Sequence, residues 1–352
     1  MASRIALLAP FAFPSVRGNA VTADRVARGL RQRGVELRLW DLSATPEAEV
    51  EVAVEAYRPG VIHAFHAFRV GPFALRLARR MELPLVVTLT GTDVNHDLFD
   101  PERAPAVRRV LEGAATTVVF HGSIGERVAA TLPDVRSRLV VVPQAAALPE
   151  GEPFDLAVRW SLPDDRLLIV LPGGIRTVKR PRLPLAPLGR LVARRPELRL
   201  LYAGPILDAD EGQALLAALA DRPWTRFLGV VPHAQMASLL AQADVVLNCS
   251  LSEGGMANSV LEALAAGRAV LAADIEGNHS LIEDDVTGLL FRSDDELEAQ
   301  AARLAADPVL RARLGAAGRA RVTTLYPPER EISGYVEVYR RLLPVLHLGT
   351  AG

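Results

Sequence analysis

The sequence predicts an α/β protein made of two doubly wound domains, each with a parallel sheet. Short apolar runs of strand length alternate with segments of helical period, and this alternation occurs in two successive series. Near-continuous apolar strands joined by helices indicate a parallel sheet that is covered on both faces. A length of 352 residues also exceeds one typical core and suggests two domains of roughly 150 to 180 residues each.

The predicted strands fall into two sets of six. The first set comprises residues 4–9, 36–40, 60–65, 85–89, 116–120 and 139–142. The second set comprises residues 167–171, 199–203, 226–228, 244–248, 269–272 and 288–291. In the helical segment 22–34, Val26 and Leu30 share one face and Gly34 ends the helix.

A segment rich in proline, residues 143–153, separates the two sets and reads as a linker. The predicted domains are therefore residues 1–150 and 151–327. A last helical segment, residues 328–346, is long enough to pack back across the junction. Ligands of such sheets bind at the carboxyl ends of the strands, so the loops after the strands are the candidate site.

Composition excludes several classes of protein. The net charge is −1 and neither half is strongly basic, which argues against a nucleic-acid partner. The single cysteine, Cys249, excludes an internal disulfide. No apolar run reaches the roughly 18 residues of a membrane span, and the apolar start reads as a strand rather than a signal peptide. We therefore expect a cytoplasmic protein with small-molecule ligands; peripheral membrane contact and oligomeric state stay open.

Lys179 is the only lysine among the 40 basic residues, and it lies in the turn-like segment GGIRTVKRP after a predicted strand. A lysine ammonium is a compact point charge, whereas an arginine guanidinium is a wide planar fork. A chain that otherwise uses arginine could keep lysine where only a point charge fits, as beside a phosphate. The alternative is a chance lysine on a solvated loop.

The densest cluster of chemical groups follows the strand ADVVLN. A loop with Glu253, Gly254 and Gly255 leads into a helix that begins near Ala257 and carries Glu262. Backbone N–H groups at a helix start, approached over glycines, suit a diphosphate. The carboxylates would then hold sugar or ribose hydroxyls beside it. Alternatively, Glu253 stabilises the helix dipole and Glu262 is a surface residue.

A second candidate group follows a strand of the first domain. Thr92 and Asp93, in LTGTD, would lie at the strand end, where Asp93 could hold a substrate hydroxyl or cap the following turn. His63 and His66, in VIHAFHA, follow a neighbouring strand, although a lone histidine is more often structural. The remaining histidines are scattered without metal-ligand spacing, so we expect a metal-independent protein.

The stretch SEGGMANSVLEALAAGRAVLAADIEGNHSLIEDDVTGLLF resembles the signature of glycosyltransferase family 4. These are retaining enzymes of GT-B fold that transfer a sugar from a nucleotide diphosphate. Within this family, the likeness is greatest to the group called glycosyltransferase 1 domain-containing protein 1. The segments RGNAVTADRVARGL, GTDVNHD and LPGGIRTVKRP carry this resemblance. RGNAVTADR and LTGTD are also similar to segments of bacterial selenosugar synthases. The resemblance implies two Rossmann-like domains that face each other across a cleft, an N-terminal acceptor domain and a C-terminal donor domain.

The resemblance also implies residue roles. Glu253 would lie near the donor sugar and Glu262 on the ribose, while Lys179 and Arg176 would neutralise the diphosphate. With Asp93, these make the predicted catalytic set of Arg176, Lys179, Glu253 and Asp93. The other predicted donor contacts are Gly18, Asn19, Gly204, Gly229, Val230, Gly254, Gly255, Met256, Ala257 and Asn258. The predicted acceptor contacts are His66, Thr92 and Asn95. The substrate would be a UDP or GDP sugar, with no cofactor and no metal.

Three positions depart from the family pattern. Eight residues separate Glu253 from Glu262, one more than the pattern has, and Arg176 lies closer to Lys179 than usual. Thr90 stands where many members have histidine. Three alternatives therefore stay open: a sugar-nucleotide epimerase, which lacks an evident acid and base pair, a non-catalytic nucleotide-sugar binding protein, and transfer to selenophosphate. The last would need an anion site, for which Arg17 and Arg25 are candidates.

Overall fold

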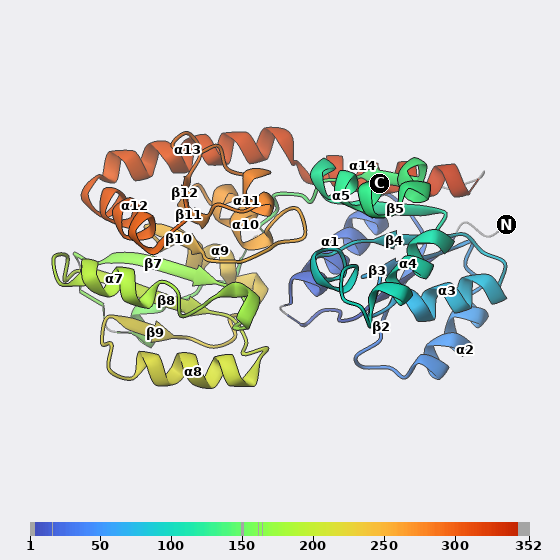
Figure 1. Ribbon diagram of the computed structural model, residues 1–352, viewed down its shortest axis with the longest axis horizontal. Helices are drawn as coiled ribbons and strands as arrows, with labels where there is room; N and C mark the ends of the chain where they lie inside the picture. Colours follow the sequence, from blue (N-terminus) through green and yellow to red (C-terminus); the bar gives the residue numbers. More distant parts are fainter. Residues whose placement is uncertain (1–3, 16, 149–150, 161, 164, 344–352) are drawn as a thin grey trace. The chain divides into compact units, whose positions relative to one another are not determined.

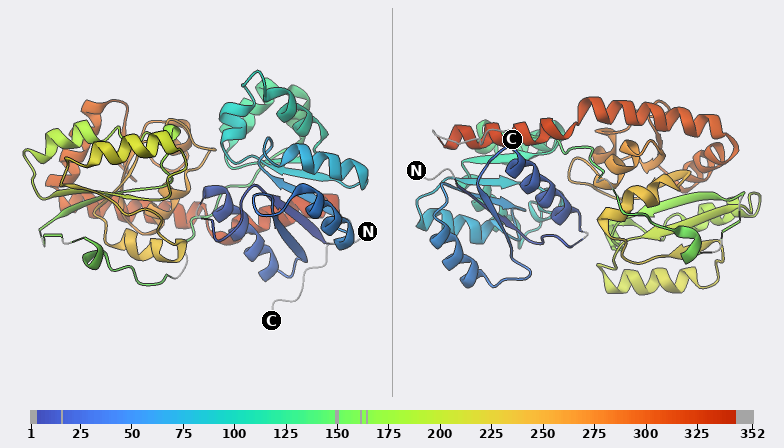
Figure 2. Two further views of the ribbon diagram at one scale, coloured as in Figure 1. Left: turned by 90° about the horizontal axis from the view of Figure 1, so that it is seen from below. Right: turned by 180° about the vertical axis from the view of Figure 1, so that it is seen from behind.

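The computed structural model describes residues 4–15, 17–148, 151–160, 162–163 and 165–343. The chain forms two compact units, shown in Figure 1. The first unit comprises Met1–Ala145 and Pro328–Gly352, and the second comprises Ala146–Pro327. Each unit has one parallel six-stranded sheet with helices against it, as Figure 2 also shows.

The sheet of the first unit has the order β2-β1-β3-β4-β5-β6. Its strands are β1 Ile5–Ala9, β2 Leu37–Asp41, β3 Val61–Phe65, β4 Leu85–Thr88, β5 Thr116–Val119 and β6 Leu139–Val141. Its helices are α1 Gly18–Gln32, α2 Glu47–Tyr57, α3 Gly71–Arg80, α4 Ala104–Gly113, α5 Gly122–Thr131 and α14 Pro328–Leu342, with short helical segments at η1 Asp93–Asp97 and η2 Pro133–Arg138. One core joins α2, α3, α4 and α5 to one face of the sheet, and a second joins α1 and α14 to the other face.

Helix α14 belongs to the first unit although it follows the second in sequence. Tyr335 and Tyr339 are fully buried in the same core as α1. The Tyr339 hydroxyl lies 2.6 Å from Nδ1 of His63, and Arg25 of α1 makes an ion pair of 2.7 Å with Glu331. The predicted helix reached residue 346; the observed helix ends at Leu342, and residues 344–346 lie outside the described part of the chain.

The sheet of the second unit has the order β12-β11-β10-β7-β8-β9. Its strands are β7 Leu167–Pro172, β8 Leu198–Ala203, β9 Thr225–Phe227, β10 Val245–Asn248, β11 Ala269–Ala273 and β12 Leu289–Phe291. Its helices are α6 Leu156–Arg159, α7 Leu185–Val192, α8 Ala209–Leu219, α9 His233–Ala241, α10 Asn258–Ala265, α11 Glu276–His279, α12 Asp294–Ala306 and α13 Pro308–Leu325, with a 3-10 turn at η3 Thr177–Lys179.

All twelve predicted strands are present, and each observed end lies within one residue of the predicted end. The strands are apolar on both sides: Ile169 and Val170 are adjacent in β7 and both are buried. This pattern arises because helices cover both faces of a parallel sheet. The prediction of two doubly wound units is therefore confirmed.

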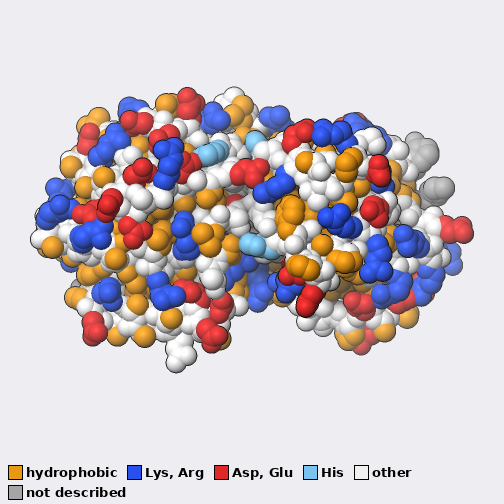
Figure 3. Space-filling model, viewed as in Figure 1, with side chains coloured by type: hydrophobic (Ala, Val, Ile, Leu, Met, Phe, Trp, Pro, Cys, Tyr) orange, Lys and Arg blue, Asp and Glu red, His pale blue; other side chains and the backbone are white. Residues whose placement is uncertain are grey.

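Basic and acidic side chains are interspersed on the face of the molecule shown in Figure 3. Across residues 4–343, leaving out the few undescribed positions, no helix combines the length and the apolar character that a bilayer crossing requires.

Candidate active site

The second unit has a topological switch point between β7 and β10. From β7 the chain proceeds outward through β8 and β9, and then returns to β10, on the other side of β7, and proceeds through β11 and β12. The loops that leave the carboxyl ends of β7 and β10 therefore diverge. Open α/β sheets bind ligands in the crevice at this point.

Two contacts hold the loops after β7 and β10 together. The N–H of Leu251 donates a hydrogen bond of 2.8 Å to the carbonyl of Val178. Arg180 reaches back and donates from Nε to the carbonyl of Cys249 at 2.7 Å. Lys179 lies between Val178 and Arg180, so these contacts fix it beside the β10 loop.

Lys179 donates a hydrogen bond from Nζ to Oε1 of Glu253. The same carboxylate oxygen accepts from Oγ of Ser250 at 2.6 Å and from Nδ2 of Asn248 at 3.3 Å. The side chains of Lys179 and Glu253 are 18% and 11% exposed. Burial raises the pKa of Glu253, but the charge of Lys179 and the three hydrogen bonds outweigh it and hold that pKa below its ordinary value. The glutamate is therefore a stably charged group in a mostly enclosed place.

Glu253→Gln is expected to flatten the acid side of the stability profile. The pKa of Glu253 is lower in the folded protein than in the unfolded chain. The charged carboxylate therefore adds to the free energy of unfolding above the ordinary glutamate pKa of about 4.3, and this stabilisation is lost as the pH falls through the lowered pKa. The free energy of unfolding of the variant should thus fall less steeply than that of the wild type below about pH 5. Urea unfolding at a series of pH values measures this. Parallel profiles would contradict a charged Glu253.

The loop between Glu253 and α10 is closely packed. Met256 and Ala257 are buried, and Gly255 has a φ of 100°, which a residue with a side chain rarely adopts. Oγ of Ser280 donates to the carbonyl of Gly255 at 2.7 Å. Ala257 is the N-cap of α10, so the predicted helix start was correct to one residue.

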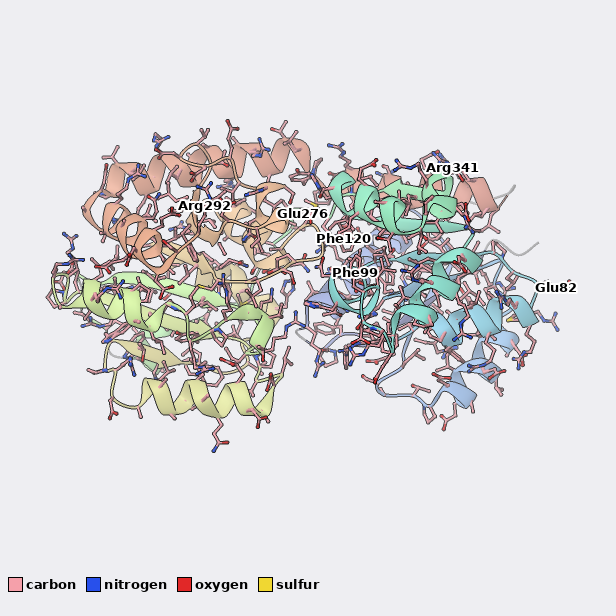
Figure 4. The ribbon with its side chains drawn as sticks, in the orientation of Figure 1. Glu82, Phe99, Phe120, Glu276, Arg292 and Arg341 are labelled. Carbon is pink, nitrogen blue, oxygen red and sulfur yellow. The ribbon has the colours of Figure 1, made fainter. Side chains whose placement is uncertain are left out.

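A glycine after β11 makes room for Glu253. Glu276, labelled in Figure 4, opens α11, and Gly277 follows it. A Cβ atom on Gly277 would lie 2.5 Å from Cβ of Glu253, a distance that real Cβ atoms do not show. The close approach therefore fixes the backbone position from which Glu253 reaches Lys179.

Gly277→Ala is expected to displace Glu253 and to destabilise the fold by about 1 to 3 kcal/mol through overpacking. A matched control is Gly189→Ala in α7, where the nearest atom, on Trp224, would be 3.7 Å from the added Cβ. That control should keep or raise stability, because alanine favours helix. Urea unfolding of both variants measures the difference. Equal stability of the two variants would show that Gly277 leaves more room than its contact distance indicates.

Glu262 lies on the next turn of α10 and is only 9% exposed. Oε1 of Glu262 lies 2.9 Å from Nε2 of His233, the first residue of α9. The alternative of a surface residue is therefore wrong. His233 is a site residue that the sequence analysis missed, since it was grouped with the scattered histidines and nothing in its spacing pointed to Glu262.

Three glycines line the carboxyl ends of β7, β8 and β9. Gly173, Gly204 and Gly229 all have positive φ values, of 135°, 157° and 73°. A Cβ on Gly204 would lie 2.0 Å from the carbonyl oxygen of Gly173, so no side chain fits there. Val230 follows with 55% exposure. Arg176 immediately precedes η3, and its carbonyl accepts from the N–H of Lys179 at 2.9 Å.

The position of Asp93 in the first unit does not match the catalytic role that the sequence predicted. Asp93 is fully buried at the start of η1. Its carboxylate oxygens accept hydrogen bonds from backbone N–H groups at shortest distances of 2.8 to 3.1 Å, donated by Ala67, Thr90, Gly91 and Val94. A carboxylate so enclosed holds its own loop to the loop after β3. It does not cap η1, so the geometry favours neither the predicted contact with a substrate hydroxyl nor the capping alternative.

His66 and Thr92 do lie together. Nδ1 of His66 accepts from the N–H groups of Phe68 and Arg69, both at 3.2 Å, so Nε2 carries the proton and donates to Oγ1 of Thr92 at 2.8 Å. Burial is the largest cause of a lowered pKa for His66. The ring is therefore neutral, with both nitrogens engaged.

The other predicted residues of the first unit lie outside the contact between His66 and Thr92. Oδ1 of Asn95 accepts from Nη2 of Arg127 at 2.6 Å. Gly18 and Asn19 are the first two residues of α1. His63 is structural: burial lowers its pKa to about 3, and it bonds Thr88 as well as α14.

The described side chains include no group of three or more His, Cys, Asp or Glu residues that could hold a metal ion. The site thus offers one lysine, two mostly buried glutamates, and glycine backbone that a ligand can approach closely because no side chain covers it.

Comparison with known proteins gives a family match. The model of the family described as "Glycosyl transferases group 1" matches residues 166–307. The "Glycosyltransferase 1 domain-containing protein 1" of Xenopus tropicalis is 27% identical over 305 residues, which are 84% of this chain and 86% of that protein. A "D-inositol 3-phosphate glycosyltransferase" of Kribbella flavida is 30% identical over 298 residues, which are 77% of this chain and 69% of that protein.

Solved structures share the fold. Anabaena Alr3699/HepE, crystallised in complex with UDP and glucose, superposes with a TM-score of 0.81 at 15% identity, covering 97% of this chain and 100% of that one. Sucrose-phosphate synthase from Thermosynechococcus elongatus gives a TM-score of 0.77 at 20% identity, covering 97% and 99%. The expected GT-B fold is confirmed by these likenesses.

Proposed function

The chain belongs to the group 1 glycosyl transferases, and from this premise we propose that it is a retaining enzyme of family 4 that uses a nucleotide-diphosphate sugar. The observation that carries the proposal is the contact between Lys179 and Glu253 at the switch point of the second unit. It joins a cation suited to phosphate with a carboxylate suited to sugar hydroxyls.

On the donor side, Lys179 and Arg176 neutralise the diphosphate as it leaves, so the reaction needs no metal ion. Glu253 accepts hydrogen bonds from the donor sugar, and Glu262, oriented by His233, accepts them from the ribose. The glycines at 204, 229, 254 and 255 let the nucleotide approach the backbone closely. The likeness to HepE, which was crystallised with UDP-glucose, supports a UDP sugar as the donor; a GDP sugar is the alternative.

The second unit is then the donor domain and the first unit the acceptor domain. The acceptor domain then holds Gly18 and Asn19 at the start of α1, His66 and Thr92 after β3 and β4, and Asn95 in η1. The acceptor attacks from the face that the diphosphate leaves, and a phosphate oxygen takes its proton. Positioning supplies much of the rate enhancement in such a reaction.

Incubation of the purified full-length chain with labelled UDP and GDP sugars tests this function. Transfer to an acceptor mixture, or slow hydrolysis of the donor, supports it, and the anomeric configuration of the product tests retention. Conversion of the donor sugar to its epimer, or tight binding without any turnover, would overturn it.

A further inference from the structure

The segment after β11, residues 277–280, lies against the β10 loop, residues 249–257. β10 and β11 are neighbours in the sheet, so the loops that leave their carboxyl ends meet at one edge. Gly277 opens this contact, since a Cβ atom on it would lie 2.5 Å from Cβ of Glu253. The residues that follow Gly277 add polar contacts to the same loop.

Asn278 connects this segment to the carboxylate of Glu253. It is fully buried, and its Nδ2 donates to the carbonyl of Ala273 at 2.8 Å and to Oδ1 of Asn248 at 3.3 Å. Nδ2 of Asn248 in turn donates to Oε1 of Glu253 at 3.3 Å. The orientation of the carboxylate therefore depends on the segment after β11 as well as on Lys179.

Ser280 fixes the backbone of the β10 loop. It is buried, and its Oγ lies 2.7 Å from the carbonyl oxygen of Gly255 and 2.9 Å from that of Gly277. A hydroxyl has one hydrogen to donate, so the two carbonyls share it. Gly255 has a φ of 100°, and glycine loses more conformational freedom than any other residue when it is ordered. The bond from Ser280 thus restrains a part of the loop that would otherwise rotate freely.

Tyr326 holds Ser280 from the opposite side. Ser280 is the C-cap of α11, a position whose carbonyl has no partner within the helix. Oη of Tyr326 donates to this carbonyl at 2.9 Å. The backbone of Tyr326 is fixed in turn, because its carbonyl accepts from the N–H of Ala146 at 2.8 Å. A chain of hydrogen bonds therefore runs from Ala146 through Tyr326 and Ser280 to Gly255.

We propose that Ser280 is a positioning residue for the donor site and that Tyr326 holds it in place. The inference rests on the proposed function, in which Gly254 and Gly255 meet the nucleotide and Glu253 meets the donor sugar. Without the hydroxyl of Ser280, the ligand itself must order the loop, and this ordering lowers the affinity. The cost arises on binding and is the same in the ground state and the transition state. The donor KM should therefore rise while kcat is kept.

Calorimetric titration of UDP, or of GDP where UDP does not bind, into the full-length chain tests this role. Ser280→Ala is expected to bind the nucleotide at least about fivefold more weakly than wild type, and Tyr326→Phe at least about twofold more weakly. Each substitution removes one hydroxyl. With the labelled donor, KM should rise by the same factors and kcat should stay within about twofold of wild type.

Thr225→Val is the matched control. Thr225 is buried at the start of β9, and its Oγ1 donates to the carbonyl of Arg222 at 2.8 Å. The substitution removes a buried hydroxyl from the amino end of a strand, whereas the site lies at the carboxyl ends. Below its unfolding transition, a merely destabilised chain stays almost wholly folded and keeps its Kd. Thr225→Val is therefore expected to show the wild-type Kd and donor KM.

The outcomes separate this inference from the proposed function. A wild-type Kd in Ser280→Ala, or an equally weakened Kd in Thr225→Val, would overturn the positioning role and leave the donor site in place. A wild-type Kd in Tyr326→Phe would overturn the part given to Tyr326, and this variant decides the matter if Ser280→Ala does not fold. Failure of wild type to bind both UDP and GDP would overturn the proposed function, and this inference with it.

Discussion

Lys179→Ala is expected to lower the turnover of the donor by about 10²- to 10³-fold, the usual effect of removing one group that stabilises charge on a leaving oxygen. The variant also removes the cationic partner of the mostly enclosed Glu253, while Ser250 and Asn248 still donate hydrogen bonds to it. Initial rates at saturating donor measure turnover, and calorimetry measures the affinity for UDP. Both the turnover and the UDP affinity are expected to be lower than in wild type.

Arg182→Ala is the control for this experiment. Arg182 lies three residues further along the same loop and pairs with Glu211 at 2.8 Å. Its side chain is 52% exposed, so the ion pair should add little to stability. The substitution should therefore leave turnover near the wild-type value. Wild-type turnover in Lys179→Ala would contradict the site.

Lys179→Arg refines the same test. It keeps the charge but replaces a point charge by a wide fork, in a place where the lysine side chain is only 18% exposed. We expect turnover to stay well below wild type, by about tenfold or more. Near-normal turnover would show that charge alone suffices there, although the site would stand.

Asp93→Ala is expected to destabilise the first unit by about 3 kcal/mol or more, because several buried N–H groups lose their acceptor at once. Asp100→Ala is a matched control. Asp100 accepts from the N–H groups of Glu102 and Arg103 in an exposed turn, and its loss should cost about 1 kcal/mol.

Urea unfolding of both aspartate variants measures these costs. A wild-type midpoint for Asp93→Ala, combined with lost activity, would restore the catalytic role that the sequence suggested. A large loss of stability supports the role in the loop.

The strands could be predicted because a parallel sheet covered on both faces needs short, continuously apolar runs, and such runs are visible in the sequence. The loops of Lys179 and Glu253 could be located for the same reason, since each follows one of these strands. Their direct contact could not be predicted. It depends on β7 and β10 being neighbours, and on Arg180 joining the two loops, which no local pattern encodes.

Burial was the other quantity that the sequence did not reveal. A polar residue in a turn after a strand looks the same whether it meets a ligand or its own backbone, so Asp93 was assigned the wrong partner. The contact between His233 and Glu262 joins the start of α9 to the second turn of α10, 29 residues further along the chain. Pairings of that kind are set by how the helices pack on the sheet.

Hydrogen–deuterium exchange of the full-length chain, with and without UDP, tests the location of the donor site most directly. Bound ligand slows exchange where it stabilises the backbone. The expected result is slower exchange in peptides that cover residues 173–180 and 249–262, in the loops after β7 and β10. Binding of UDP that leaves both segments unchanged and slows exchange elsewhere would contradict a donor site built on Lys179 and Glu253.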